Sequence, residues 1–229
     1  MTLSMPELDP VFEAYEKLVA ETDAVFSRVA SMYPDCVTCK SGCSDCCHAT
    51  FDLSLVEAMY LNLRFQESFD FGPQRSAILE RAADTDRKLT RLKRDYFREL
   101  RDAGGSEEAM NAILEEASRA RIRCPLLDGE DRCILYEYRP ITCRLYGIPS
   151  VIGGKTHVCG KTRFNTGQGY PTVQIEKIQD RLDQLSQGIR DAVSSRFKEL
   201  HTVYVPVSMA LLTNYDNTYL GIGPAPKDA

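Results

Sequence analysis

Apolar residues recur at three- and four-residue steps in several stretches of the chain, and each stretch predicts an amphipathic helix. The first covers residues 10–33, where Pro10 suits a first helical turn and Pro34 opposes continuation of the helix. The face that this helix should bury is largely apolar: Val11, Tyr15, Leu18, Val19, Thr22, Val25, Phe26 and Val29. Residues 1–35 are therefore expected to be a helical segment that packs along one side.

Three further helices are predicted at about residues 55–66, 74–102 and 106–120. Ser54 and Glu57 have the spacing of a capping box at the start of the first of them. Gly104 and Gly105 end the second helix, and Ser106 can cap the third. Their charged residues fit a solvated outer face, so residues 55–120 are expected to form a helical insert.

The helical period returns from Val173 to Leu200 as an apolar stripe. We expect the longest helix of the protein here, with its stripe packed on other helices. A coiled-coil dimer seam is the alternative, although about three heptads is short for one. The segment from Val203 to Leu220 is apolar and aromatic and is expected to fold back onto the body.

Residues 122–165 lose the helical period and are interrupted by proline and glycine, which predicts loops with short strands or turns, such as Cys133 to Tyr136. A loop this long is unusual in a compact domain unless something else holds it. The apolar fraction of 43% is nevertheless sufficient for a true core.

The formal net charge of −5 gives the chain no general attraction to nucleic acid or anionic lipid, and lysine and arginine form no basic tract in the sequence. No apolar run approaches the ~20 residues that span a bilayer, and residues 1–10 lack the pattern of an export signal. The expected location is the cytoplasm, where thiols stay reduced.

Nine cysteines fall into two groups along the chain. The first group is Cys36, Cys39, Cys43, Cys46 and Cys47; the second is Cys124, Cys133, Cys143 and Cys159. An odd number leaves one thiol over in a disulfide framework, whereas eight thiolates fill two four-cysteine sites. Dense thiols without an export signal usually bind metal, either zinc or the iron of iron–sulfur clusters. Burial as small apolar residues is the alternative for single cysteines such as Cys36 or Cys159.

The adjacent pair Cys46-Cys47 narrows the kind of site. Neighbouring side chains diverge, so two of them rarely bind one zinc ion tetrahedrally. They suit two nearby sites or different atoms of one polynuclear cluster. We therefore expect the two cysteine segments to interleave, with one cysteine of the pair facing each centre.

Seven other residues near the cysteines each allow more than one role: His48, His157, Arg139, Arg144, Tyr136, Tyr138 and Tyr146. Either histidine could be a ligand, but an ordinary hydrogen bond is the simpler expectation for His48. The arginines could donate to sulfur atoms or pair with acids such as Glu137 or Asp131. The tyrosines are expected to shield the site from water.

Three motifs carry a family resemblance: GCSDCC preceded by Cys39, then CPLL from Cys124, then CILYEYRPITCR from Cys133. Over about residues 36–160 the chain resembles the CxxCxxCC or YkgJ-type family, described as a zinc- or iron-chelating domain, whose members are often labelled iron–sulfur cluster proteins. Some relatives are larger flagellin lysine N-methylases.

The resemblance implies eight metal-binding cysteines: Cys39, Cys43, Cys46, Cys47, Cys124, Cys133, Cys143 and Cys159. The sequence departs from the family pattern because three residues, not two, separate Cys39 and Cys43. Cys36 lies outside the matched positions and is expected to be the spare thiol.

We therefore predict one mainly α domain over residues 1–229, with an irregular, metal-stapled, cysteine-rich middle. Its cysteine-cluster core is residues 36–160, containing the insert 55–120, and residues 1–35 and 173–229 flank it. An iron–sulfur cluster, [4Fe-4S], with a redox or electron-transfer role is favoured. A zinc-binding structural or protein-interaction module and a methyltransferase-like enzyme with structural metal are the alternatives. A protein or redox partner is expected, and nucleic acid and membrane are not; the oligomeric state is left open.

Overall fold

The computed structural model describes residues 5–40, 42–165 and 167–223, and most of this part is helical, as predicted. Its α-helices are α1 (Asp9–Met32), α2 (Leu55–Ser68), α3 (Pro73–Asp102), α4 (Glu107–Ser118), α5 (Ile141–Leu145), α6 (Ile175–Ala192) and α7 (Val207–Leu212). The described chain contains no helix that is both long and apolar enough to cross a membrane. That one domain spans the whole chain stays a prediction.

Short strands tie the segments between the helices together. In one pair, β1 (Asp52–Ser54) runs antiparallel to β5 (Tyr204–Pro206). In the other sheet, β2 (Ser150–Ile152) lies between an antiparallel β3 (Lys155–His157) and a parallel β4 (Val173–Gln174). The first pair joins the chain just after the first cysteine group to the segment that leads into α7.

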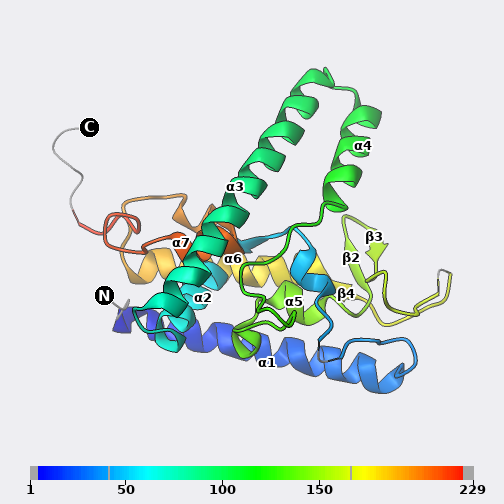
Figure 1. Cartoon of the computed structure of the whole chain (residues 1–229), viewed down its shortest axis with the longest axis horizontal. Coiled ribbons are helices and arrows are strands. Elements are labelled where there is room, and N and C mark those ends of the chain that lie inside the picture. Colours follow the sequence, from blue (N-terminus) through cyan, green and yellow to red (C-terminus); the bar gives the residue numbers. More distant parts are fainter. Residues whose placement is uncertain (1–4, 41, 166, 224–229) are drawn as a thin grey trace.

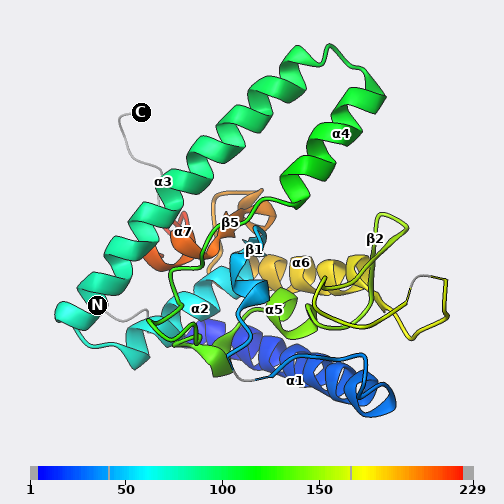
Figure 2. The ribbon, with the colours of Figure 1, turned by 45° about the vertical axis from the view of Figure 1, so that its right-hand side comes forward.

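Helices α1, α2 and α6 lie together in the body, and α3 and α4 form a hairpin that projects from it (Figures 1 and 2). The core contains large side chains that are fully buried: Tyr15, Leu18, Leu53, Leu61, Phe65, Ile148 and Tyr215. Tyr215 and Leu220 are both buried, so the C-terminal segment packs back on the body as predicted. In α1, Phe12 is buried although the predicted face omitted it, and Val25 is 42% exposed although that face included it.

The capping box predicted at the start of α2 is present and connects that helix to α5. One carboxylate oxygen of the buried Glu57 accepts from the backbone nitrogen of Ser54 at 3.2 Å and from the Ser54 hydroxyl at 2.9 Å. The other oxygen accepts from the backbone nitrogen of Ile141 at 3.1 Å. Burial raises the pKa of Glu57. This carboxyl thus fixes the start of the short helix that carries Cys143.

The prediction of a helix from 173 to 200 was wrong at its C-terminal end. Helix α6 ends at Ala192, because Ser194 adopts a positive φ of 49° and the backbone nitrogen of Ser195 bonds to the carbonyl of Arg190 at 3.0 Å. This Schellman-type ending stops the helix without glycine or proline, so no local sequence signal marks it. Helix α3, with 30 residues, is longer than α6, with 18.

The projecting hairpin is held mainly by its own two helices. In the part of α3 nearer the body, buried residues continue only as far as Leu89. Beyond that residue, Leu92, Tyr96 and Leu100 are half-buried along one face. Ser106 caps α4 as predicted, accepting from the backbone nitrogen of Ala109 at 3.3 Å.

Candidate metal centre

The two cysteine segments lie side by side in the structure. The backbone nitrogen of Cys124 donates to the carbonyl of Cys47 at 2.7 Å, and that of Ile122 donates to the carbonyl of His48 at 2.9 Å. An antiparallel bridge joins Ala49 to Arg121. Segments about 75 residues apart are therefore paired by main-chain bonds, and this pairing brings their sulfur atoms together.

Five thiols line one cavity of about 50 Å³, which we call the thiol cavity: Cys46, Cys47, Cys124, Cys133 and Cys143. Most of its other walls are apolar, with Phe51, Ile122 and Leu126 from the flanking loops and Leu89 from α3. Residues at the β5–α7 junction, Pro206 to Ser208, also line it. The cysteines come from three separate loops and from α5, so tertiary structure rather than a local motif builds the site.

Cys46 and Cys47 both line this cavity, whereas one cysteine of the pair was expected from the sequence to face each centre. They lie in a single 3₁₀ turn, Asp45–His48, and their sulfur atoms are 3.9 Å apart. The turn is so short that both side chains reach the same space.

The thiols influence one another's protonation. Hydrogen bonds from Cys143 and then Cys47 lower the pKa of the Cys46 thiol, so it is the group that loses its proton first. The bond to Cys46 and burial raise the pKa of Cys143, and burial raises the pKa of Cys124 to about 12. Because metal ligands must be thiolates, binding of a cation here would release protons.

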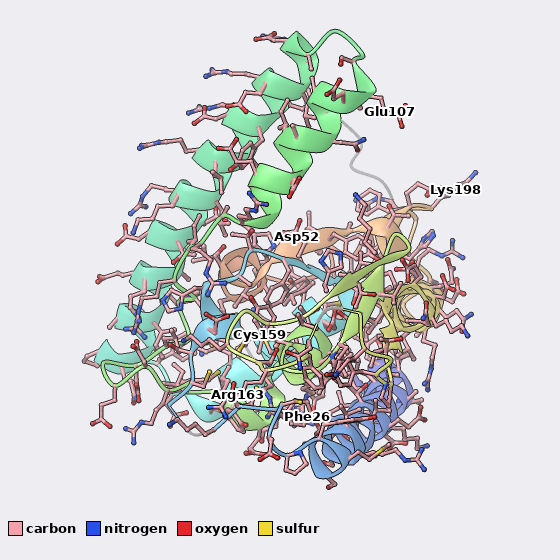
Figure 3. All side chains as sticks on the ribbon, turned by 90° about the vertical axis from the view of Figure 1, so that its right-hand side faces the viewer. Phe26, Asp52, Glu107, Cys159, Arg163 and Lys198 are labelled. Atoms are coloured by element: carbon pink, nitrogen blue, oxygen red, sulfur yellow. The ribbon has the colours of Figure 1, made fainter. Side chains whose placement is uncertain are left out.

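A second thiol group lies beside the first and contains Cys39, Cys43 and Cys159, together with the carboxylate of Asp45. The thiol of Cys159 donates to Asp45 Oδ2 at 3.4 Å. Burial, followed by the nearby thiols of Cys43 and Cys159, raises the pKa of Cys39 to about 11. The view in Figure 3 shows Cys159 in the body of the molecule, below the hairpin.

Asp45 and Gly147 are two site residues that the sequence reasoning missed. Asp45 Oδ1 accepts from Arg121 at 2.8 Å and lies 3.7 Å from Lys161 Nζ, so this carboxylate joins three segments. A β-carbon placed on Gly147 would lie 2.2 Å from Cys39 Sγ. The absence of a side chain at Gly147 therefore makes the room that Cys39 occupies. An acidic residue inside a cysteine run was the available signal for Asp45.

The structure brings together all eight predicted ligands in these two groups, but it does not place them as a closed cage. Among the described residues, no three His, Cys, Asp or Glu side chains are already positioned to hold one metal ion. The donor set fits a thiophilic metal, and coordination would require the side chains to rotate inward. Cys36 does not line the thiol cavity; its carbonyl accepts from the backbone nitrogen of Arg163 at 2.9 Å. The eightfold ligand set and the spare Cys36 stay predictions.

The histidines have separate surroundings. His48 Nδ1 donates to the carbonyl of Ser44 at 3.0 Å, which is the ordinary hydrogen bond expected for it. His157 lies in β3, whose three residues are all exposed. In the structure neither ring lines the thiol cavity.

The buried Arg144 joins α1 to the loop that precedes α5. Its acidic partner is Asp23 of α1 rather than Glu137 or Asp131. Its guanidinium bonds to Asp23 Oδ2 at 2.5 Å, to the carbonyl of Arg139 at 2.9 Å and to the carbonyl of Glu137 at 2.5 Å. Arg139 lines the thiol cavity, and its Nη1 donates to the carbonyl of Tyr136 at 2.8 Å. Its Nη2 lies 3.9 Å from Asp23 Oδ1. The sequence could not show that α1 supplies the acid for both arginines.

The expectation that three tyrosines shield the site was wrong for the thiol cavity. Tyr136 is 57% exposed, and its ring stacks against the guanidinium of Arg139. The ring of Tyr138 packs on that of Tyr60. Tyr146 accepts from Arg121 Nη1 at 3.1 Å, near the second thiol group. Aliphatic side chains and Phe51 cover the thiol cavity instead, because α3 and the β5–α7 junction fold over it.

A family model that describes a putative zinc- or iron-chelating domain matches residues 38–160, more than half of the chain. The protein belongs to the CxxCxxCC family. The matched range contains the eight cysteines of the two thiol groups and leaves out Cys36. Comparisons with curated proteins and with solved structures returned no match. In this CxxCxxCC protein the cysteine cluster is thus the part that corresponds to the family's zinc- or iron-chelating domain.

Proposed function

We propose that this protein binds an iron–sulfur cluster, of the [4Fe-4S] type, at the thiol cavity and serves in redox chemistry or electron transfer. One observation carries the proposal: five thiols from separate segments line a single small cavity. The five include the adjacent pair Cys46 and Cys47, and neighbouring side chains rarely bind one zinc ion tetrahedrally but can bind different iron atoms of one cluster. Four of them suffice for a cluster, and the fifth can exchange with them or face the neighbouring group.

The cavity walls support a redox role. Leu89, Ile122 and Leu126 present hydrocarbon to the thiols, so water is largely excluded from that side. Solvent exposure and burial are among the factors that set the potential of a cluster. Arg139, the charged residue on the wall, would offset part of the negative charge of several thiolates. When bound, the cluster supplies a one-electron couple, with an electron entering from a reducing partner protein and leaving to an oxidised acceptor.

A zinc-stabilised structural or protein-interaction module is the second candidate, and the second thiol group favours it. Cys39, Cys43 and Cys159 together with the Asp45 carboxylate make four donors of the kinds that zinc accepts. The segments around them contain little regular structure, so a metal ion there would hold loops in place.

The proposal includes a reducing, cytosolic location and a redox partner. Thiolate ligands persist where thiols stay reduced, as they do in the cytosol. No observation on the described residues favours a methyltransferase-like reaction.

Protein purified without oxygen tests the proposal. We expect stoichiometric iron and inorganic sulfide, broad visible absorption that bleaches with dithionite, and an electron paramagnetic resonance signal after reduction. Colourless protein with stoichiometric zinc and no iron would overturn the redox proposal and support the zinc module.

Three serine variants connect this result to the cavity. Cys46→Ser and Cys133→Ser each remove a thiol of the cavity and should lower the iron content and loosen the fold. Cys36→Ser is the matched control and should leave both unchanged. Equal metal loss in the Cys36 variant would show that Cys36 is a ligand and that the spare thiol lies elsewhere.

A further inference from the structure

Five arginines lie along one face of α3 at alternating steps of four and three residues, although the sequence shows no continuous basic tract. We call Arg87, Arg91, Arg94, Arg98 and Arg101 the arginine stripe. Residues at these steps share one side of a helix, and the stripe spans roughly 21 Å at 1.5 Å per residue.

The arginine stripe points away from the rest of the protein. Leu89 is buried and Leu92 and Tyr96 are half-buried on the opposite face of α3, about 180° around the helix from the stripe. All five arginines are exposed. Figure 3 shows nitrogen-tipped side chains projecting from the outer side of α3, away from α4.

The stripe is not explained by the stability of the hairpin. Like charges three and four residues apart repel each other and destabilise a helix. Asp84, Asp95 and Asp102 pair with the arginines Arg87, Arg98 and Arg101. Within the part of the chain that the structure describes, Arg91 and Arg94, at the middle of the stripe, make no ion pair.

An aromatic side chain accompanies these two arginines. Phe97 is 68% exposed and lies three residues after Arg94 and four before Arg101, so it borders the stripe. An exposed aromatic ring beside arginine stems offers apolar contact area as well as charge.

We propose that the arginine stripe docks an acidic α-helix of a partner protein. The alternating four- and three-residue steps match the seam by which one helix packs against another, so glutamates at the same steps on a partner would face the arginines in register. Guanidinium groups bind carboxylates in a bidentate manner, and Phe97 would contact the apolar edge of the partner helix.

Observations on the same helix favour an acidic helix over nucleic acid. Three aspartates, at positions 84, 95 and 102, lie along one flank of the arginine stripe. A nucleic-acid backbone is wider than the stripe, so its phosphates would also meet these aspartates and be repelled. The whole chain carries a net charge of −5, which opposes long-range attraction of a polyanion. A narrow line of arginines with aspartates along one flank favours a partner whose negative charges are confined to an equally narrow line.

The test uses the full-length protein and a synthetic helical peptide of about 20 residues with glutamate at four- and three-residue steps, long enough to cover the stripe. A peptide of the same composition in scrambled order, a single-stranded oligonucleotide and phosphatidylserine vesicles are compared with it by fluorescence anisotropy or sedimentation. We expect the ordered peptide to bind roughly tenfold more tightly than the scrambled one, with affinity that falls as salt rises.

Charge reversal then locates the binding surface. Arg91→Glu with Arg94→Glu should weaken binding of the ordered peptide by roughly tenfold or more, and a peptide with lysine in place of glutamate should then bind this variant. Lys177→Glu with Lys198→Glu makes the same charge change at exposed sites elsewhere and should have little effect. Equal binding of ordered and scrambled peptides, equal effects of the two double variants, or tighter binding to the oligonucleotide or vesicles would overturn the proposal.

Discussion

The α3–α4 hairpin and the cysteine-rich region are held together by different kinds of interaction. Beyond Leu89 the hairpin relies mainly on bonds within each helix and on contacts between two helices that are neighbours in the chain, with Lys93 of α3 paired to Asp52 of β1 at 2.7 Å. The cysteine-rich region, residues 36–51 and 122–165, relies on contacts between distant segments, such as the bond from Cys124 to the carbonyl of Cys47. The hairpin can therefore form from local sequence, whereas the cysteine-rich region needs its partners in place first.

This difference also separates the two proposals. A bound metal would hold the cysteine-rich region, where regular structure is short. The hairpin presents its outer face to solvent and needs no metal for that. Treatments that remove metal should act on the cysteine-rich region and spare the projecting part of the hairpin.

Removal of metal should produce the largest effect. Structural zinc sites in small domains contribute about 10–16 kcal/mol of apparent binding free energy, so a chelator under reducing conditions should strongly lower the unfolding midpoint. Hydrogen exchange followed by mass spectrometry should show lost protection in residues 36–51 and 122–165. Protection in α3 beyond Leu89 and in α4 should stay unchanged, and uniform loss over both regions would contradict the division.

Gly147→Ala should produce the next largest effect, because the new β-carbon would lie 2.2 Å from Cys39 Sγ. Overpacking of this kind costs about 1–3 kcal/mol, and the displaced Cys39 should also reduce metal content. Gly160→Ala is the matched control, since a β-carbon there meets nothing within 4 Å. Urea unfolding and metal analysis of both variants provide the measurement; equal behaviour would show that Cys39 moves without consequence.

Ser106→Ala should have a smaller and strictly local effect. The variant loses the hydroxyl that accepts from Ala109 at the start of α4, at a cost of about 1 kcal/mol to that helix. Hydrogen exchange should quicken in the first turn of α4, while metal content stays at the wild-type level. A fall in metal content would mean that the hairpin and the cysteine-rich region are coupled.

Glu57→Gln should change the pH dependence of stability, on top of a constant loss that arises because the amide has one acceptor oxygen where both carboxylate oxygens accept. Burial raises the folded-state pKa of Glu57, so its contribution is fully present below pH 4.5 and is lost as pH rises through the folded pKa. Glutamine can replace glutamate in a capping box and has no proton to lose. The free energy of unfolding of the variant relative to wild type should therefore increase from pH 4.5 upward; parallel curves would contradict this.

The helices could be predicted from the sequence because their signals are local. The predicted limits of α1, α2 and α3 agree with the structure to within about two residues, and the caps at Ser54 and Ser106 are present. The end of α6 failed because Ser194 takes a left-handed conformation that serine rarely adopts, and no local pattern announces it.

The candidate site could be predicted only in part. The density of cysteines predicted a common site, and the family resemblance implied the eight thiols that the fold gathers. Neither could show that Cys46 and Cys47 face one cavity, that Gly147 makes room for Cys39, or that Arg144 pairs with Asp23. Those contacts depend on which distant segments meet in the fold. Local sequence patterns do not indicate that.

X-ray absorption spectroscopy of anaerobically purified protein tests the central claim most directly, because it reports which atoms surround the metal. Thiolate ligation from both cysteine segments predicts a first shell of sulfur, at about 2.3 Å for zinc and with a further iron–iron distance for a cluster. Cys46→Ser and Cys133→Ser should each reduce that sulfur shell. A first shell made of nitrogen and oxygen, or a sulfur shell unchanged in both variants, would contradict the account.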